Sequence, residues 1–277
     1  MLAEQTLLVT GSTDGLGRQV AARLVERGAT VLIHGRHPDR VEQVRAEIGA
    51  ERGYVADLAS LEQTRRLAGE VGRDHERLPV LVNNAGILGT PSGERELSED
   101  GYELHFAVNY LAGFVLTLAL LPLLIRSAPS RVVNVSSGAQ RPIDFDDVML
   151  EHRYDHTRAY SQSKLAQVMF TFELAERLQR DGQDGLAVAA LHPASLMDTK
   201  MVRRSYGTAW TSVEEGGAAT LRLVADAPPE EIDGRYFEGR REAAANRQAY
   251  DERARRRLWE LSEELSGLPA RGHRPAH

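Results

Sequence analysis

The sequence places a tyrosine and a lysine four residues apart, Tyr160 and Lys164. Residues at this spacing share one face of a helix, so the ammonium of Lys164 can act on the phenol of Tyr160. A free tyrosine has a pKa near ~10, and a nearby cation favours the phenolate and lowers that pKa. Lowering it by about 3 units requires roughly 4 kcal/mol of differential stabilisation. The pair could therefore carry a proton at neutral pH, although an ordinary surface helix can show the same spacing.

A glycine-rich turn, residues 10–17, separates the first apolar run from the first helical segment. Gly11 would allow a tight turn, Gly15 would permit close approach of the backbone to a ligand, and Gly17 would let the helix pack near the strand. Free N–H groups at the start of that helix would face a pyrophosphate. The pattern predicts a dinucleotide site, against the alternative of a glycine-rich turn without a ligand. The other predicted cofactor-binding residues of this turn are Ser12, Thr13, Asp14 and Leu16.

The end of the second apolar run indicates which dinucleotide binds. An NAD enzyme usually carries Asp or Glu there to accept hydrogen bonds from the ribose 2′-hydroxyl. Residues 33–36 read Ile-His-Gly-Arg and offer no carboxylate. The planar guanidinium of Arg36 could instead bind a 2′-phosphate, with help from Arg18. The sequence therefore favours NADP(H) over NAD(H), the alternative for Arg36 being a solvated strand end.

Apolar runs of strand length alternate with longer helical segments along the chain. This alternation predicts parallel strands joined by crossover helices, in a doubly wound α/β sheet. The predicted strands are Thr6–Thr10, Thr30–His34, Gly53–Ala56, Val80–Asn83, Arg131–Ser136, Ala187–Leu191 and Arg235–Phe237. The predicted helices are Gly15–Arg27, Pro38–Ile48, Leu61–Arg73, Glu99–Ile125, Thr157–Gln179, Ser212–Ala225 and Glu242–Leu265. Because no repeat or linker divides the chain, we expect one domain over residues 1–268 and a flexible tail over 269–277.

The composition excludes several classes of protein. The net charge of −6 gives no general attraction to nucleic acid, and the arginines of residues 253–257 are followed by glutamates, as on a solvated helix face. The absence of cysteine excludes disulfides, thiolate metal sites and cysteine nucleophiles, and it fits a cytoplasmic location. The start of the chain shows no secretory signal.

Two further segments could be mistaken for a membrane span and for a metal site. The apolar run Tyr110–Ile125 has 16 residues, fewer than the ~20 that usually span a bilayer, so we expect a buried helix and no membrane span. His152 and His156 lie near several aspartates, but without a recognisable ligand spacing. A polar loop is therefore favoured there, and no metal site is predicted.

Five blocks of residues with a recognisable pattern follow one another along the chain. They are Thr10–Gly17, Asp57-Leu58, Asn83–Gly86, Asn109, and Ser137 with Tyr160 and Lys164. In this order they resemble the short-chain dehydrogenase/reductase family, over about residue 5 to residue 240. The resemblance implies a single Rossmann-like domain whose seven-stranded parallel sheet is flanked by helices. It also implies transfer of a hydride between the nicotinamide of NADP(H) and a carbonyl or alcohol carbon.

The resemblance assigns roles by position. Tyr160 would be the general acid/base, Ser137 rather than Ser136 would hold the substrate oxygen, Lys164 would bind the nicotinamide ribose, and Asn109 would anchor a water relay. Asn83 would steady the sheet. The remaining cofactor positions are Asp57 and Leu58 near the adenine, Asn84, Ala85 and Gly86 along the adenosine, and Pro193 and Thr199 at the nicotinamide carboxamide.

The chain departs from the family pattern in two places. The segment between Ser137 and Tyr160 is longer than in the shorter members, and its extra part, residues 140–156, resembles the insert of the retinol-dehydrogenase-like branch. The sequence leaves open whether this insert contacts the substrate or covers the sheet. Ala194 stands where the family usually has glycine, which leaves the exact carboxamide contact open.

The resemblance also bears on substrate and assembly. Residues 197–210 correspond to the family's substrate lid, and they predict an apolar, bulky substrate through Met197, Met201, Val202, Tyr206 and Trp210. Phe106–Ile125 and Ala166–Phe170 carry apolar surface. We expect a homodimer or homotetramer with these helices at the interface, since a four-helix contact of this sort is common in the family.

Two other functions share part of the pattern. An NADP(H)-sensing protein that binds the cofactor without turnover could dispense with Tyr160 and Lys164, which this chain keeps. Sugar-nucleotide epimerases share the glycine motif and the Tyr–Lys pair, but they usually need a longer C-terminal half than the residues after Lys164 provide. The sequence does not determine the natural substrate, the direction of reaction or the stereochemistry of hydride transfer.

Overall fold

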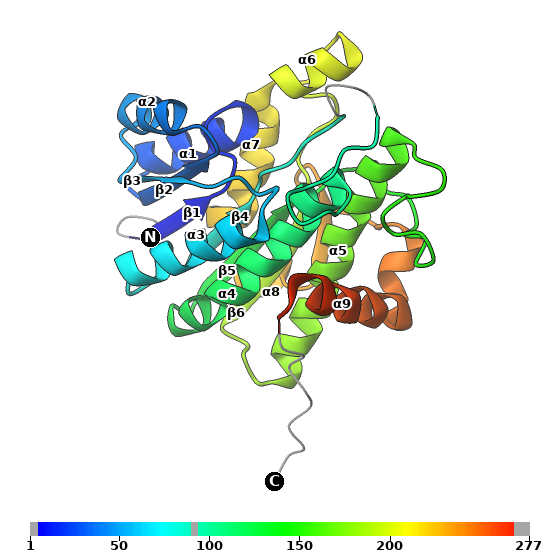
Figure 1. Ribbon diagram of the computed structural model, residues 1–277. Helices are drawn as coiled ribbons and strands as arrows, with labels where there is room; N and C mark the ends of the chain where they lie inside the picture. The colour runs from blue at the N-terminus through cyan, green and yellow to red at the C-terminus, as the bar shows by residue number, and fades with distance from the viewer. Residues whose placement is uncertain (1–4, 90–93, 269–277) are drawn as a thin grey trace.

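A single sheet forms the centre of the computed structural model, which describes residues 5–89 and 94–268 (Figure 1). Its strand order is β3-β2-β1-β4-β5-β6-β7-β8, and every pair is parallel except β7 with β8. This confirms the doubly wound α/β fold and its seven parallel strands, to which β8 adds a short antiparallel edge. The strands are β1 Thr6–Val9, β2 Thr30–Gly35, β3 Arg52–Val55, β4 Val80–Asn83, β5 Ser130–Val135, β6 Leu186–His192, β7 Arg235–Glu238 and β8 Arg241–Glu242.

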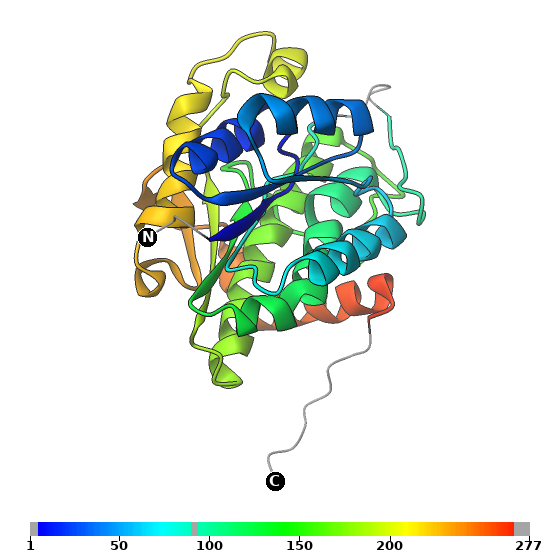
Figure 2. The ribbon, with the colours of Figure 1, turned by 90° about the vertical axis from the view of Figure 1, so that its left-hand side faces the viewer.

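Helices cover both faces of the sheet (Figures 1 and 2). Because successive side chains of a strand point to opposite faces, Leu7 and Val9 join one apolar core and Leu8 joins the other. The first core includes side chains of α1, α2 and α7, and the second includes side chains of α3, α4, α5 and α9. The helices are α1 Gly15–Glu26, α2 Pro38–Ile48, α3 Leu61–Asp74, η1 Phe106–Leu111, α4 Ala112–Arg126, α5 His156–Arg180, α6 Lys200–Tyr206, α7 Val213–Leu221, η2 Arg222–Asp226, α8 Pro229–Ile232, η3 Arg247–Tyr250 and α9 Glu252–Ser266.

Two helices begin later than the sequence predicts. The helix expected from Glu99 begins at residue 104, because Gly101 has a φ of 84° and the preceding residues form a turn. The helix expected from Glu242 begins at Glu252, where Asp251 caps the first backbone N–H groups. The alanines before it favour a helix, yet Ala243 N donates to Tyr236 O and follows the edge strand. The short elements α6, α8 and β8 were not predicted.

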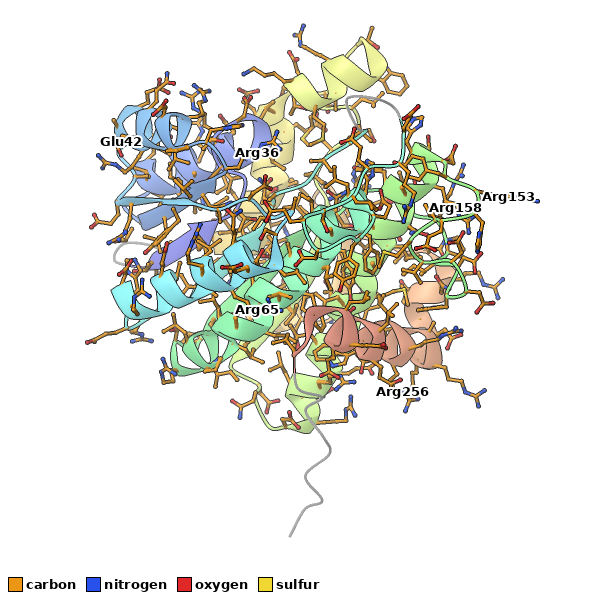
Figure 3. All side chains as sticks on the ribbon, viewed as in Figure 1. Arg36, Glu42, Arg65, Arg153, Arg158 and Arg256 are labelled. Carbon is orange, nitrogen blue, oxygen red and sulfur yellow. The ribbon has the colours of Figure 1, made fainter. Side chains whose placement is uncertain are left out.

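Helix α9 packs across the apolar helices on one side of the sheet (Figure 1). The Trp259 ring lies 5.2 Å from the Phe114 ring and 5.9 Å from the Phe170 ring, centroid to centroid. The hydroxyls of Tyr110 and Ser262 are hydrogen bonded at 2.7 Å. The apolar side chains that prompted the predicted interface between chains are therefore covered from within the same chain. The outer face of α9 is charged and includes the exposed Arg256 (Figure 3).

The insert, residues 140–156, packs on the start of α5 and on the segment before α9. The backbone N and O of Ile143 pair with the side chain of Gln248 at 2.7 and 3.0 Å. Gln162 of α5 donates to Val148 O at 2.6 Å, and Leu150 is fully buried. These contacts make the insert a cover over α5.

One helical segment, Phe106–Arg126, is long and apolar enough to cross a membrane by length and composition, with a mean hydropathy of 2.1. Of its most apolar window, 72% is buried inside the fold, as is usual for the core helix of a doubly wound protein. Among the described residues it is the one segment of this kind.

Candidate active site

The predicted site residues meet at the carboxyl ends of β1, β4 and β5. In an open parallel sheet, ligands bind in the crevice where the strand order reverses, outside the carboxyl ends of the strands. The order reverses here between β1, which pairs with β2 on one side, and β4 on the other. The glycine turn follows β1, Asn84–Gly86 follow β4, and Ser137 follows β5. The topology therefore brings the motifs to one edge of the sheet.

The glycine turn packs against the loop after β4 more closely than any side chain would allow. Gly11 has a φ of +61°, and a Cβ on it would lie 2.8 Å from Ala85 Cα. A Cβ on Gly17 would lie 2.4 Å from Gly11 O. The amide of Asn84 donates to Thr10 O at 2.8 Å and to Gly11 O at 3.1 Å. Asn84 and Ala85 thus hold the turn in shape, with the close backbone packing that a dinucleotide turn requires.

The other residues of the turn divide into an inner and an outer set. Ser12 is buried and donates to Val9 O at 2.7 Å, and the Leu16 side chain is in the core. Asp14 caps α1 by accepting from Gly15 N at 2.9 Å, and it pairs with Lys200 at 2.9 Å. The Thr13 methyl would lie 2.6 Å from a Cβ on Gly35. Thr13 therefore packs against the end of β2, and Asp14 is exposed at the start of α1.

Arg36 and Arg18 differ in their availability for a 2′-phosphate. Arg36 is exposed directly after β2 (Figure 3). Arg18 is held by an ion pair with Glu47 of α2 at 2.8 Å. Arg36 is thus the free candidate of the two, and the help expected from Arg18 would require that ion pair to break.

His34 is a buried residue of this region that the sequence reasoning missed. Its Nδ1 accepts from Gly11 N at 3.2 Å, and its Nε2 lies 3.1 Å from Ala56 O. Only the neutral imidazole with a proton on Nε2 can make both hydrogen bonds. Burial lowers the pKa of His34 to about 4, which agrees with that form. His34 thereby ties the glycine turn to the end of β3; a polar residue inside an apolar strand was the available signal.

Asp57 and Leu58, predicted near the adenine, follow β3. Asp57 Oδ1 accepts from Ala59 N at 2.9 Å, and its backbone N donates to Gln63 Oε1 at 2.9 Å. Leu58 is buried, with 6% exposed. Both residues shape the turn into α3 beside the predicted adenine position.

Asn109 lies in the π-helical turn η1, a geometry that is frequent at functional sites. Its Oδ1 accepts from Ile87 N at 2.7 Å, and its Nδ2 donates to Ile87 O at 3.1 Å and to Ser163 Oγ at 3.0 Å. A Cβ on Gly86 would lie 3.2 Å from Asn109 Oδ1 and 3.4 Å from Lys164 Nζ. Asn109 therefore fixes the loop after β4 next to Lys164. A role as a water anchor stays a prediction.

Tyr160 and Lys164 lie on one face of α5, as their spacing predicts. Lys164 Nζ lies 5.8 Å from the centroid of the Tyr160 ring. The lysine is 5% exposed and donates to Val135 O and to Gln167 Oε1, both at 3.0 Å. Burial lowers the pKa of Lys164 from its ordinary 10.5 to about 7. The charge of this amine is therefore sensitive to its surroundings near neutral pH.

The two serines after β5 have different surroundings. Ser136 Oγ donates to Lys164 O at 2.7 Å and so attaches α5 to the sheet. Ser137 Oγ accepts from Ala139 N at 3.1 Å, which leaves its hydroxyl proton for another acceptor. This arrangement favours Ser137 as the serine that meets a substrate oxygen. Asn83, one strand away, donates to Thr117 and Asn134 inside the fold and steadies the sheet, as predicted.

The segment after β6 joins the site from the other side. Pro193 is buried directly after His192, whose Nε2 lies 3.1 Å from Ser195 Oγ. Thr199 caps α6, and its methyl would lie 3.2 Å from a Cβ on Gly15. The predicted nicotinamide side therefore approaches the glycine turn.

The lid side chains differ in their burial. Val202 is 8% exposed, Met201 38% and Trp210 76%. Tyr206 is also a predicted lid residue, but its side chain lies outside the described part of the structure. The lid thus presents apolar side chains to solvent as well as to the fold.

Comparison with known proteins identifies relatives that are similar over nearly the whole chain. A family model described as short chain dehydrogenase matches residues 5–209. Retinol dehydrogenase 13 of Mus musculus is 37% identical, over 97% of this chain and 87% of that protein. Retinol dehydrogenase 14 of Homo sapiens is 36% identical, over 95% of this chain and 86% of that protein.

Solved structures share the fold. An uncharacterized protein from Mycobacterium paratuberculosis has a TM-score of 0.79 at 31% identity, covering 96% of this chain and 94% of that one. A short chain dehydrogenase from Shigella flexneri, complexed with NADP, has a TM-score of 0.70 at 26% identity, covering 87% of this chain and 98% of that one. The likeness therefore extends over most of both chains.

Proposed function

Because this chain belongs to the short-chain dehydrogenase family, we propose that it interconverts a carbonyl compound and an alcohol with NADP(H) as its cofactor. The observation that carries this function is the pairing of Tyr160 with Lys164. The amine lies 5.8 Å from the phenol ring, beside Gly86 and Asn109, at the crevice where the strand order reverses. A proton carrier and its charge partner are thus placed where a dinucleotide binds in this class of sheet.

The residues of the site divide the reaction between them. When bound, the nicotinamide supplies or accepts a hydride. In the reducing direction the Tyr160 hydroxyl donates its proton to the substrate oxygen, and in the oxidising direction the phenolate takes that proton back. The ammonium of Lys164 stabilises the phenolate, and the Ser137 hydroxyl hydrogen bonds to the substrate oxygen. Asn109 and Asn84 keep the surrounding loops in place.

A preference for NADP(H) is supported by Arg36. This guanidinium is exposed after β2, where residues 33–36 offer no carboxylate to accept from a ribose hydroxyl. Two solved short chain dehydrogenases similar to this chain, one complexed with NADP and one with NADPH, also support this preference.

Arg36→Ala should weaken NADPH binding by about 10- to 100-fold, because a hydrogen-bonded charge pair contributes about 1.5–3 kcal/mol. NADH, which lacks the 2′-phosphate, should bind the variant and the wild type equally. Titration of cofactor fluorescence measures both constants. Arg23→Ala is the matched control, since Arg23 is an exposed arginine of α1 that pairs with Glu26. Equal losses for NADPH and NADH would remove Arg36 from the 2′-phosphate site.

An apolar, bulky substrate is supported by the lid and by the relatives. Val202, Met201 and Trp210 place apolar side chains on the segment that follows the nicotinamide side. Relatives named retinol dehydrogenases act on a substrate of that kind, as their names state. A panel of aldehydes and ketones of increasing apolar size, followed by NADPH absorbance, tests the function. Tight NADPH binding without turnover of any member would favour the cofactor-sensing alternative.

The expected homodimer or homotetramer stays a prediction. The apolar helices on which that prediction was based are covered by α9 of the same chain. Because α9 covers that surface and presents charged side chains outward, an oligomer would have to form through other surfaces or by displacement of α9. Sedimentation at micromolar concentration tests the prediction: a mass of two or four chains would support it, and a mass of one chain would refute it.

A further inference from the structure

A buried glutamine beside the lysine has no part in the mechanism described above. Gln167 lies on α5, three residues after Lys164, and only 4% of it is exposed. Its Oε1 accepts a hydrogen bond from Lys164 Nζ at 3.0 Å. The sequence predicts that residues 166–170 lie at an interface between chains, whereas the structure turns the Gln167 side chain inward onto Lys164.

Few hydrogen-bond acceptors stabilise the charged form of Lys164. An ammonium has three N–H donors, and within the described residues Val135 O and Gln167 Oε1 take two of them. The third remains for a ligand such as the nicotinamide ribose. Burial lowers the pKa of Lys164 to about 7, and hydrogen bonds to the charged form act against that effect. Of the two acceptors, Gln167 is the one supplied by a side chain.

We propose that Gln167 is the positioning residue that holds the amine of Lys164 beside Tyr160 and stabilises its protonated form. Gln167 acts within the proposed function, because the proton chemistry of Tyr160 depends on that ammonium. The backbone that carries Gln167 is attached to β5: Gln167 O accepts from Thr171 Oγ1 at 2.8 Å, and Thr171 Oγ1 accepts from Asn134 of β5 at 2.9 Å. The same strand supplies Val135 O, so the backbones of both acceptor residues are held at β5.

The other titratable groups near Lys164 come from two elements. Tyr160 lies on the same helix, and His192 lies at the end of β6. Burial lowers the pKa of His192, Glu238 of β7 acts in the opposite direction, and Lys164 lowers it further. In the part of the chain that the structure describes, no carboxylate contacts Lys164 Nζ. The charge of Lys164 therefore depends on neutral acceptors. Of these, only the side chain of Gln167 can be altered by substitution, since Val135 O belongs to the backbone.

Two substitutions test the role in opposite directions. Gln167→Glu keeps size and polarity and places a carboxylate at the amine, so it should raise the pKa of Lys164 by about one unit or more. Gln167→Leu removes the acceptor and should lower that pKa. Gln162→Leu is the matched control, because Gln162 is a buried glutamine of the same helix that bonds Val148 O instead. Gln167→Glu carries the test alone if the leucine variant fails to fold.

The composition makes the measurement direct, since the chain contains only two lysines, Lys164 and Lys200. NMR of protein labelled with ¹³C at lysine Cε shows two signals, and Lys200→Arg assigns them. Titration follows the pKa of Lys164 in the cofactor-free protein. With an active carbonyl substrate, the alkaline limb of the pH–rate profile should move to higher pH in Gln167→Glu and to lower pH in Gln167→Leu.

An unchanged Lys164 titration in Gln167→Glu, or an equal shift in Gln162→Leu, would overturn the role of Gln167. This readout needs neither cofactor nor turnover. It therefore separates a failure of this inference from a failure of the proposed function, which would instead appear as no turnover of any carbonyl compound by the wild type.

Discussion

Tyr160→Phe should lose at least about 99% of its turnover while the protein still binds NADPH. The variant keeps the ring beside Lys164 and loses only the hydroxyl that passes the proton to the substrate oxygen. Proton transfer by a positioned group contributes about 10²- to 10⁴-fold to a rate, so kcat should fall by at least two orders of magnitude. The dissociation constant for NADPH should change little, since the glycine turn and Arg36 remain. Steady-state kinetics and a fluorescence titration measure the two quantities.

Tyr250→Phe is the control for this substitution. Tyr250 ends η3, its hydroxyl accepts from Ala245 N at 3.0 Å, and its ring packs on Phe172, twelve residues after Tyr160 on α5. Its variant should keep the turnover of the wild type. Full activity of Tyr160→Phe would mean that another group donates the proton.

Lys164→Met should lose activity and change the pH dependence of stability. The folded state lowers the pKa of this amine from 10.5 to about 7, so between these values the unfolded chain binds more protons. The free energy of unfolding of the wild type therefore rises with pH across this window, and the cost of the buried charge is fully present below pH 7. Methionine has no such cost. Between about pH 6 and about pH 10, the free energy of unfolding of the wild type should therefore rise by about 3–5 kcal/mol more than that of the variant.

Denaturant unfolding at several pH values checks this expectation. The absolute stability of Lys164→Met also includes the loss of the hydrogen bonds to Val135 O and Gln167, so the pH trend is the clearer quantity. Lys200→Met is the matched control, since Lys200 is exposed and its removal should leave the trend of the wild type intact. A Lys164→Met trend parallel to that of the wild type would contradict a buried amine that loses its proton near neutral pH.

Local patterns predicted most of the sheet and the main motifs. Leu7, Leu8 and Val9 form a buried strand because a parallel sheet is covered on both faces, and the glycines that follow permit the close packing onto Ala85. The four-residue spacing of Tyr160 and Lys164 was enough to place them on one face. These features depend on residues that are near one another in the chain.

Features that depend on distant contacts were missed. A buried histidine or glutamine can be recognised as unusual, but the sequence does not show that His34 would join Gly11 to Ala56 or that Gln167 would face Lys164. Helix α9 was predicted as a helix, yet its place on the apolar helices depends on Trp259 meeting Phe114. Because of that contact, side chains that look like exposed apolar surface in the sequence are covered by α9 of the same chain.

Transfer of deuterium from the cofactor tests the central claim most directly. The wild type is incubated with an apolar aldehyde and NADPH that carries deuterium at both positions of the hydride-donating carbon, and the alcohol is examined by mass spectrometry. We predict one deuterium on the carbinol carbon with the wild type, and no deuterated alcohol with Tyr160→Phe over the same time. An NADPH-bound wild type that yields no deuterated alcohol from any aldehyde of the panel would contradict the proposed redox function.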